Sequence, residues 1–203
     1  MKQLDHLVYA TTNLEKGVLQ MEQLLGVRAT PGGNHPAWGT HNALIALGGD
    51  QFLEIIAPDP DQPPPAGPRI FQLDELEVPR LVTWAAKSDK LAFFISLGLN
   101  LGSMLEGSRQ RPDGSLLSWR LTDPAVILGD GLVPFLIDWG GTENPARTAA
   151  KGCRLIGLRA EHPTPGPIQA MLGLLELDLL VGTGPQPRLW ATIDSPNGEV
   201  LLC

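Results

Sequence analysis

One order of predicted elements recurs three times along this 203-residue chain, and that repetition is the strongest constraint on its fold. Each unit reads as a strand, a helix and three further strands, abbreviated here as βαβββ. In residues 1–57, Leu4–Ala10 alternates as a strand, Asn13 can cap a helix, and three strands follow. Residues 80–140 and 152–203 repeat a similar order. The chain is therefore predicted to be an α+β protein built from repeated βαβββ modules.

A proline-rich stretch separates the first module from the second. Residues 58–79 are interpreted as a linker and short connector, and six prolines fall between Pro58 and Pro68. Proline lacks the backbone N–H that an inner strand needs, so we expect an exposed and extended segment there. The three modules are expected to pack as one globular unit, although the second could instead be an elaboration between two principal ones.

Composition and charge exclude several classes of function. The net charge is −7 at pH 7, and an acidic surface attracts neither nucleic acid nor an anionic membrane. No apolar run approaches the ~20 residues of a membrane span, and Asp5 and His6 stand where a signal peptide would be apolar. The sequence contains no phosphate-loop or dinucleotide fingerprint, so no nucleotide cofactor is expected. These features favour a cytoplasmic protein that handles a small molecule.

Several segments resemble a known superfamily. The strand L-D-H-L-V-Y, the helix after it and the strand F-L-E-I-I-A-P resemble a module of the vicinal oxygen chelate superfamily. Longer segments such as SRQRPDGSLLSWRLTDP and GLVPFLIDWG resemble bacterial glyoxalase-like domain proteins. The resemblance implies modules paired into a cupped mixed sheet of the glyoxalase, bleomycin-resistance and dioxygenase type, around a metal and a substrate. The superfamily includes isomerases, lyases, dioxygenases, epimerases and resistance proteins, so the fold does not give the reaction.

Two polar residues interrupt the apolar strands of the first module. His6 and Glu54 lie among apolar neighbours, where an imidazole or a carboxylate is costly unless it has a partner. The resemblance implies that they lie on adjacent strands, at the positions of the superfamily's His and Glu metal ligands. Such a pair suits Zn, Mn, Fe or Ni and leaves open positions for a substrate. Two alternatives remain: a buried hydrogen bond between them, or a general-base role for Glu54, because burial raises the pKa of a carboxyl group.

The other modules offer no second pair of metal ligands. By alignment, Leu81 stands where His6 stands, and Leu136 lies near the position of Glu54. A metal site would therefore need His41, Asp138 or His162 as a ligand from an unusual place, or would be absent. His41 is carried forward as the metal candidate, and capping or loop hydrogen bonding is its alternative role.

A basic candidate site surrounds the Asp113-Gly114 turn. If the turn has two residues, Arg109, Arg111 and Arg120 come to one face of the hairpin, whereas a three-residue turn separates Arg120 from the other two. Three neighbouring guanidinium groups persist best with a counter-anion, so a carboxylate or phosphate substrate is expected. The alternatives are a solvated face, or an ion pair between Arg120 and Asp138.

Tryptophans beside polar residues could wall the pocket. Trp38 and Trp139 are candidates for substrate binding together with Asp138, and ordinary core packing is their alternative role. The predicted function is a metal-dependent lyase, isomerase or dioxygenase that acts on a small anionic substrate in the sheet cup. The alternative is a drug- or metabolite-binding protein without catalysis or metal. A homodimer, which would pair modules between chains, is left open.

Overall fold

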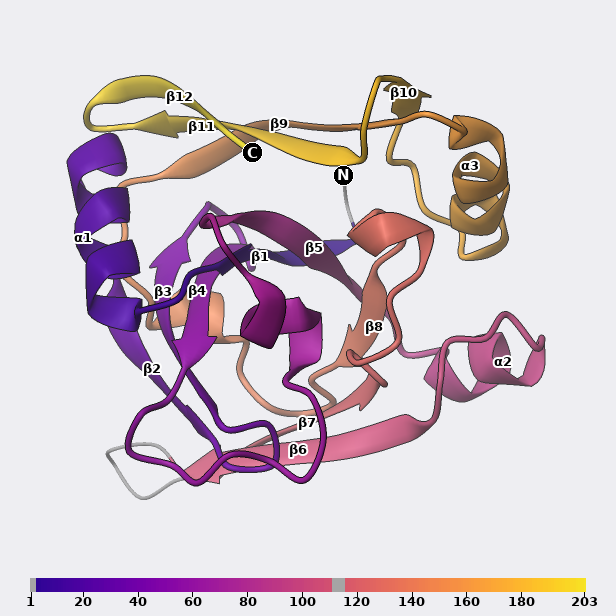
Figure 1. Cartoon of the computed structure of the whole chain (residues 1–203), viewed down its shortest axis with the longest axis horizontal. Coiled ribbons are helices and arrows are strands. Elements are labelled where there is room, and N and C mark those ends of the chain that lie inside the picture. The colour runs from indigo at the N-terminus through magenta and orange to yellow at the C-terminus, as the bar shows by residue number, and fades with distance from the viewer. Residues whose placement is uncertain (1–2, 111–115) are drawn as a thin grey trace.

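The computed structural model describes residues 3–110 and 116–203, in which a large mixed sheet curls into a half-barrel with a few helices around it (Figure 1). The larger sheet runs, from edge to edge, through β2 (Thr30–His35), β3 (Thr40–Ala46), β4 (Phe52–Pro58), β1 (Leu4–Ala10), β5 (Arg80–Lys87), β8 (Phe135–Asp138), β7 (Leu116–Thr122) and β6 (Met104–Gln110). This architecture confirms the predicted glyoxalase-like α+β fold.

The larger sheet consists of two halves with the same topology. The first half is β1 to β4 with helix α1 (Leu14–Leu25), and the second is β5 to β8 with helix α2 (Leu91–Ser96). In each half the last strand pairs in parallel with the first, so that His6 is opposite Phe52 and Ala85 is opposite Phe135. The halves join along β1 and β5, which pair antiparallel.

Helix α1 begins and ends at residues that favour those positions. The side chain of Asn13 accepts a hydrogen bond from the N–H of Lys16 at 3.0 Å, which satisfies one of the free donors at a helix start. Gly26 ends the helix in the left-handed region, with φ of 71°. Val18 and Met21 are buried against the sheet.

No helix among the described residues is long and apolar enough to cross a membrane.

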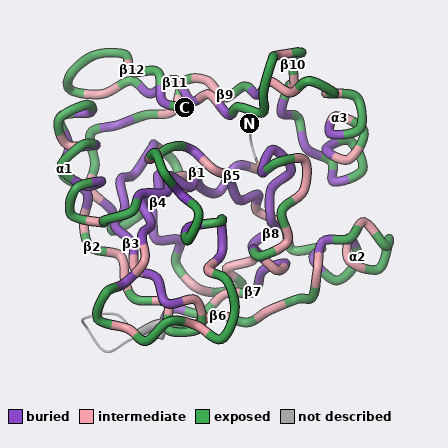
Figure 2. The backbone as a smooth tube through the Cα atoms, viewed as in Figure 1, coloured by how far each residue is buried: buried purple, intermediate pink, exposed green. Residues whose placement is uncertain are grey.

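Alternation along β1 assigns its side chains to two cores. Leu7 and Tyr9 belong to the main core on the outer face of the sheet, which α1 covers. Val8 and Ala10 face the inner side, called here the cup, where they pack with Ile56. The centre of the sheet is consequently buried on both faces (Figure 2).

The proline-rich segment crosses the mouth of the cup, in front of the sheet in Figure 1. Most of residues 60–68 are exposed, whereas three residues of the short 3₁₀ segment η1 (Ile70–Glu75) are buried and the other three are exposed (Figure 2). Ile70, Phe71 and Leu73 pack against the inner face of the sheet. The segment predicted as a connector therefore has an exposed first part and a second part that fills the cup.

The C-terminal residues have the expected order of elements and a different strand pairing. The second sheet runs through β10 (Val181–Thr183), β9 (Arg154–His162), β11 (Arg188–Ser195) and β12 (Gly198–Leu202), and α3 (Pro165–Leu174) connects β9 to β10. The first strand β9 pairs with β10 and β11, and the last strand β12 lies at the edge. This pairing differs from that of the two halves of the larger sheet, in which the first and last strands are neighbours.

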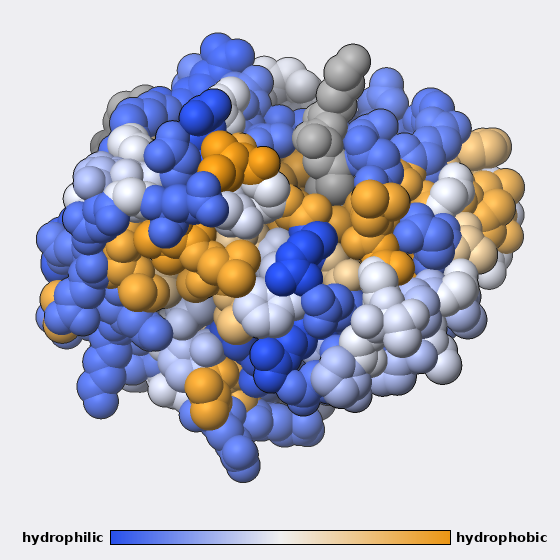
Figure 3. Space-filling view, turned by 90° about the horizontal axis from the view of Figure 1, so that it is seen from above, coloured by the Kyte–Doolittle hydropathy of each residue, from blue (hydrophilic) through white to orange (hydrophobic). Residues whose placement is uncertain are grey.

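The C-terminal sheet covers the outer face of the larger sheet. Ala191 and Ile193 of β11 are buried in the main core. The face of the C-terminal sheet that points away from the larger sheet is seen from above in Figure 3, where separate apolar patches lie among polar side chains. Ile156 and Leu201 are among the exposed apolar residues of this sheet. The short segments η2 (Gly129–Gly131) and η3 (Pro145–Arg147) complete the described secondary structure.

Candidate functional site

A buried pair of polar residues lies on β1. The pairing of β1 with β5 shifts register between Leu4 and His6, and this irregularity lets the side chains of the consecutive residues Asp5 and His6 meet. Asp5 Oδ1 lies 2.7 Å from His6 Nδ1, and both side chains are buried. An ionised carboxylate can only accept, so it binds the Nδ1–H of the ring. His6 Nε2 is left as the nitrogen available to the cup.

Asp5 is also held by groups that are distant in the sequence. Its Oδ2 accepts hydrogen bonds from Trp139 Nε1 at 3.0 Å and from Asn144 Nδ2 at 2.9 Å. Lys87 Nζ lies 3.8 Å from the same oxygen. A buried carboxylate without such partners would be strongly destabilising. These contacts therefore tie β1 to the loop after β8 and fix the orientation of the His6 ring.

Glu54 stands beside His6 because β4 pairs in parallel with β1. Glu54 Oε2 lies 3.7 Å from His6 Nε2, and Asn42 Nδ2 donates to Glu54 Oε1 at 2.5 Å. The Gly33 N–H donates to Asn42 Oδ1 at 2.8 Å, which orients the amide so that its nitrogen faces Glu54. A Cβ atom at Gly32 would lie 2.0 Å from Asn42 Oδ1, so glycine is required for this close approach.

Aromatic rings enclose the cavity of the cup. The His6 ring stacks on Phe52, with centroids 4.5 Å apart, and meets the edge of Phe135 at 5.5 Å. The cavity that His6 and Glu54 line has a volume of about 70 Å³. Its other aromatic lining residues are Trp38, Phe71, Trp119 and Trp139. None of the described residues that line it is a lysine or an arginine.

The second half of the larger sheet has apolar residues at the corresponding positions. Because Ala85 pairs with Phe135 as His6 pairs with Phe52, Ala85 corresponds to His6 and Ile137 corresponds to Glu54. This register replaces the alignment to Leu81 and Leu136 made from the sequence, and its physical basis is the parallel pairing of β5 with β8. The conclusion about ligands is unchanged, since neither alanine nor isoleucine can bind a metal.

The cup has too few metal-ligating side chains to hold a resident metal ion. An ion with bonds of about 2.1 Å could bridge His6 Nε2 and Glu54 Oε2, but protein metal sites usually have at least three protein ligands. His41 does not supply the third, because its neighbour Asn42 faces Glu54 while His41 Nδ1 lies 3.8 Å from Asp59 Oδ1. Among residues 3–110 and 116–203, no group of three or more His, Cys, Asp or Glu side chains could hold a metal. The residues present therefore do not fit one.

The structure separates the predicted basic site from the cup. The hairpin of β6 and β7 pairs Arg109 with Leu117 and Arg120 with Glu106, which is the shifted register of a longer turn. Arg120 Nη2 donates to Asp138 Oδ2 at 2.5 Å, which is the ion pair considered as an alternative. Arg111 and the Asp113-Gly114 turn lie outside the described residues.

The predicted tryptophans lie at the cup. Trp38 lines the cavity, and Trp139 both lines it and donates to Asp5. Asp138 lies in an open surface groove with Arg120. The sequence reasoning missed Asp5 and Asn42. The available signal for Asp5 was two consecutive polar residues in a strand buried on both faces, which only a local irregularity of the strand can accommodate.

Comparison with known proteins agrees with the fold. A family model described as a glyoxalase-like domain matches residues 4–175. A hypothetical protein from Staphylococcus aureus is 14% identical with a TM-score of 0.63, and the match covers 98% of this chain and 83% of that one. A methylmalonyl-CoA epimerase from Mycobacterium tuberculosis is 19% identical with a TM-score of 0.44, over 67% of this chain and 87% of that one. A search of curated proteins found no match. The family match spans most of the residues, and the chain therefore belongs to the family of glyoxalase-like domains.

Proposed function

We propose that this chain is an enzyme that moves a proton on a small molecule held in the cup, as isomerases and lyases do, with His6 and Glu54 as the acid–base pair. The observation that carries the proposal is the 2.7 Å contact between Asp5 Oδ1 and His6 Nδ1. It reserves Nε2 for the cup, and it supplies a negative charge behind the ring when the ring accepts a proton.

The proton transfer uses groups that already lie within reach of one another. His6 Nε2 takes a proton from a carbon next to a substrate carbonyl, and the electron pair of the broken C–H bond moves onto the carbonyl oxygen. The imidazolium so formed lies between the carboxylates of Asp5 and Glu54, at 2.7 and 3.7 Å. Either the imidazolium itself, or Glu54 after it has taken that proton from the imidazolium, then returns the proton to another atom of the substrate, which completes an isomerisation and leaves His6 neutral.

The lining of the cup favours a neutral substrate with an apolar or aromatic body. The described lining residues include Glu54 and several aromatic rings but no cation. An anion would be repelled by Glu54 and would find no arginine there. A cavity of about 70 Å³ admits only a few atoms, given about 30 Å³ for one water molecule in the liquid. A substrate therefore places its reacting end in the cup, or moves η1 as it enters.

A protein that binds a small molecule without reacting with it is the second candidate. It is favoured by the apolar residues Ala85 and Ile137, which leave the second half of the cup without chemical groups. The metal-dependent chemistry expected from the sequence is less well supported, because the cup provides two protein ligands, His6 and Glu54.

Solvent exchange distinguishes these candidates. Neutral aryl and alkyl ketones and 2-hydroxyketones are incubated with the protein in D₂O containing a chelator, and deuterium incorporation is followed by NMR. We expect His6→Gln to lower the exchange rate by about 10²–10⁴-fold, the range for one acid–base catalyst. Glu54→Gln should also lower it, and Asp138→Asn, outside the cup, should not.

The outcomes separate cleanly. Exchange that His6→Gln leaves unchanged would overturn the proposal. Saturable binding of panel members to the wild type without any exchange would favour the second candidate. Exchange that occurs only when Zn²⁺, Mn²⁺, Fe²⁺ or Ni²⁺ is added would favour the metal-dependent alternative.

A further inference from the structure

A second and larger cavity lies beside the cup. It has a volume of about 390 Å³, which is within the range of about 300–1,000 Å³ for small-molecule sites. We call it the outer chamber. Its walls come from η1, β5, the η2 loop and the start of β11. Phe71, Pro124 and Phe135 line both the outer chamber and the cup, so these three residues form the partition between them.

Most of the chamber wall is apolar. The apolar lining residues include Leu81, Val82, Val126, Leu132 and Leu189, with Val78 and Ile127 at the edge, in addition to the partition. Leu81, Leu132 and Leu189 are buried, while Ile127 remains 40% exposed at the edge. A wall of this kind suits the hydrocarbon part of a ligand, whose transfer from water contributes about 25 cal/mol per Å² of apolar surface.

Two cations without carboxylate partners lie at one side of the chamber. The arginines whose described side chains form ion pairs are Arg28, Arg69, Arg120, Arg147, Arg154 and Arg159. Among the arginine side chains that the structure describes, Arg80 and Arg188 are the two that form none, and both line the outer chamber. In a chain of net charge −7, this coincidence points to an anionic ligand.

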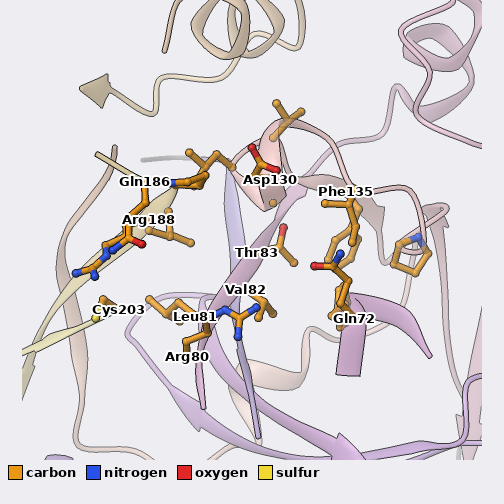
Figure 4. Close-up of a pocket in the computed structure, with 18 of the residues that line it drawn as sticks. Gln72, Arg80, Leu81, Val82, Thr83, Asp130, Phe135, Gln186, Arg188 and Cys203 are labelled. Carbon is orange, nitrogen blue, oxygen red and sulfur yellow. The ribbon is translucent and has the colours of Figure 1, made fainter. Parts of the chain in front are cut away.

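The close-up of the chamber shows how these groups are arranged (Figure 4). Arg188, Gln186 and Cys203 lie on one side, Arg80 lies low between them and Val82, and Gln72 and Phe135 lie on the opposite side. The guanidinium of Arg188 also lies over the ring of Trp190 at 5.5 Å, which helps to hold it in place.

The acidic side chain among the described lining residues of the chamber is already paired. Asp130, which Figure 4 shows above Thr83, lies 2.9 Å from His162 through its Oδ2. Asp130, Phe71 and Gln72 have φ of 53°, 59° and 54°, the left-handed region that non-glycine residues rarely adopt. Three strained residues around one cavity are typical of a ligand site.

We infer that the outer chamber binds a monocarboxylate with a hydrocarbon tail. The carboxylate of this ligand binds Arg80 and Arg188, and its hydrocarbon tail packs against the apolar wall that includes Leu81 and Leu132. The inference does not depend on the chemistry of the cup.

Calorimetric titration with three probes tests the inference. Octanoate has both the charge and the chain, acetate has only the charge, and octanol has only the chain. We expect saturable binding of octanoate to the wild type and binding of acetate and octanol that is at least tenfold weaker. The double variant Arg80→Gln/Arg188→Gln should bind octanoate about tenfold or more weakly, because a charge-assisted contact is lost at each residue.

Matched variants keep the result interpretable. Arg28→Gln/Arg154→Gln makes the same change of charge at exposed positions that do not line the chamber, and should bind octanoate as the wild type does. Ile127→Trp fills the chamber from its exposed edge and should also weaken octanoate binding. His6→Ala, in the cup, should not.

Three results would overturn the inference. These are the absence of saturable octanoate binding to the wild type, equal octanoate affinity in the two arginine double variants, and equal affinity for octanol and octanoate. Loss of octanoate binding in folded His6→Ala would assign the ligand to the cup and would also overturn it. The proposed proton transfer can fail without changing any of these results, because its test uses neutral ketones.

Discussion

The two halves of the larger sheet share a topology and differ in chemistry. The first half directs His6 and Glu54 into the cup, whereas the second half has Ala85 and Ile137 at the corresponding positions. The difference teaches that a paired module need not contribute a matching set of functional groups. One half supplies the polar groups of the cup, and the other supplies apolar wall and the donor Trp139, which binds Asp5.

The largest effect is expected when the support behind His6 is removed. Asp5→Ala leaves the ring nitrogen of His6 and the donors of Trp139 and Asn144 without their acceptor in a buried region. We expect the free energy of unfolding to fall by about 3–5 kcal/mol, measured by urea denaturation. Asp138→Ala, which removes the pair with half-exposed Arg120 and the acceptor of the Gly140 N–H, should lower it by only about 1–2 kcal/mol. Equal losses would show that the first half has no special buried network.

Exchanging residues between the halves should give unequal effects. Ile137 is buried among apolar side chains, so Ile137→Glu brings a carboxylate into a region without a donor such as Asn42 and should destabilise the fold by more than about 3 kcal/mol. Glu54→Ile leaves only the amide of Asn42 without an acceptor, at about 1–3 kcal/mol. Paired denaturation curves measure both. A larger loss for Glu54→Ile would contradict the assignment of the polar groups to one half.

A smaller effect on stability is expected from the pH-dependent contribution of Asp59, which follows β4 in the first half. Burial alone would raise the pKa of Asp59, but hydrogen bonds from Gln62, from the Asp61 N–H and from Asn34 lower it below its usual value. A lowered pKa in the folded state means that Asp59 contributes stability above the unfolded value of about 3.9, and that this contribution is lost as pH falls through the folded pKa.

Asp59→Asn removes this source of acid sensitivity. We expect a loss of about 1–2 kcal/mol at pH 7 and a smaller loss of stability than the wild type suffers when both are taken from pH 5 to pH 2.5. Thermal denaturation across that range measures it. An unchanged slope of stability against pH would contradict the assignment, and Asp138→Asn at the end of β8 serves as the control from the second half.

The sequence predicted the local structure of the larger sheet well, because local signals determine it. Asn13 and Gly26 begin and end α1 through their own hydrogen bond and backbone conformation, and the alternation in Leu4–Ala10 indicates a strand. The pairing order of the C-terminal sheet could not be read in this way. It depends on which strand β9 meets across the fold, and the order of elements along the chain is the same for either pairing.

The sequence predicted only those parts of the candidate site that do not depend on how the strands pair. The positions of His6 and Glu54 follow from the resemblance and from their apolar neighbours. Asn42 was missed because its role depends on the register of β3 against β4, which brings its amide to Glu54. The arginine cluster depended on the register of one hairpin, and a shift of one residue moves Arg120 to a different partner.

The central claim is that Asp5 holds the proton of neutral His6 on Nδ1 and leaves Nε2 available to the cup. Nitrogen-15 NMR of the imidazole rings tests it most directly, because the chain has four histidines and His6→Gln assigns the signal. The account predicts that the neutral His6 ring carries its proton on Nδ1 and that Glu54→Gln leaves this tautomer unchanged. A neutral His6 protonated on Nε2 would contradict the account, because His6 would then present no base to the cup.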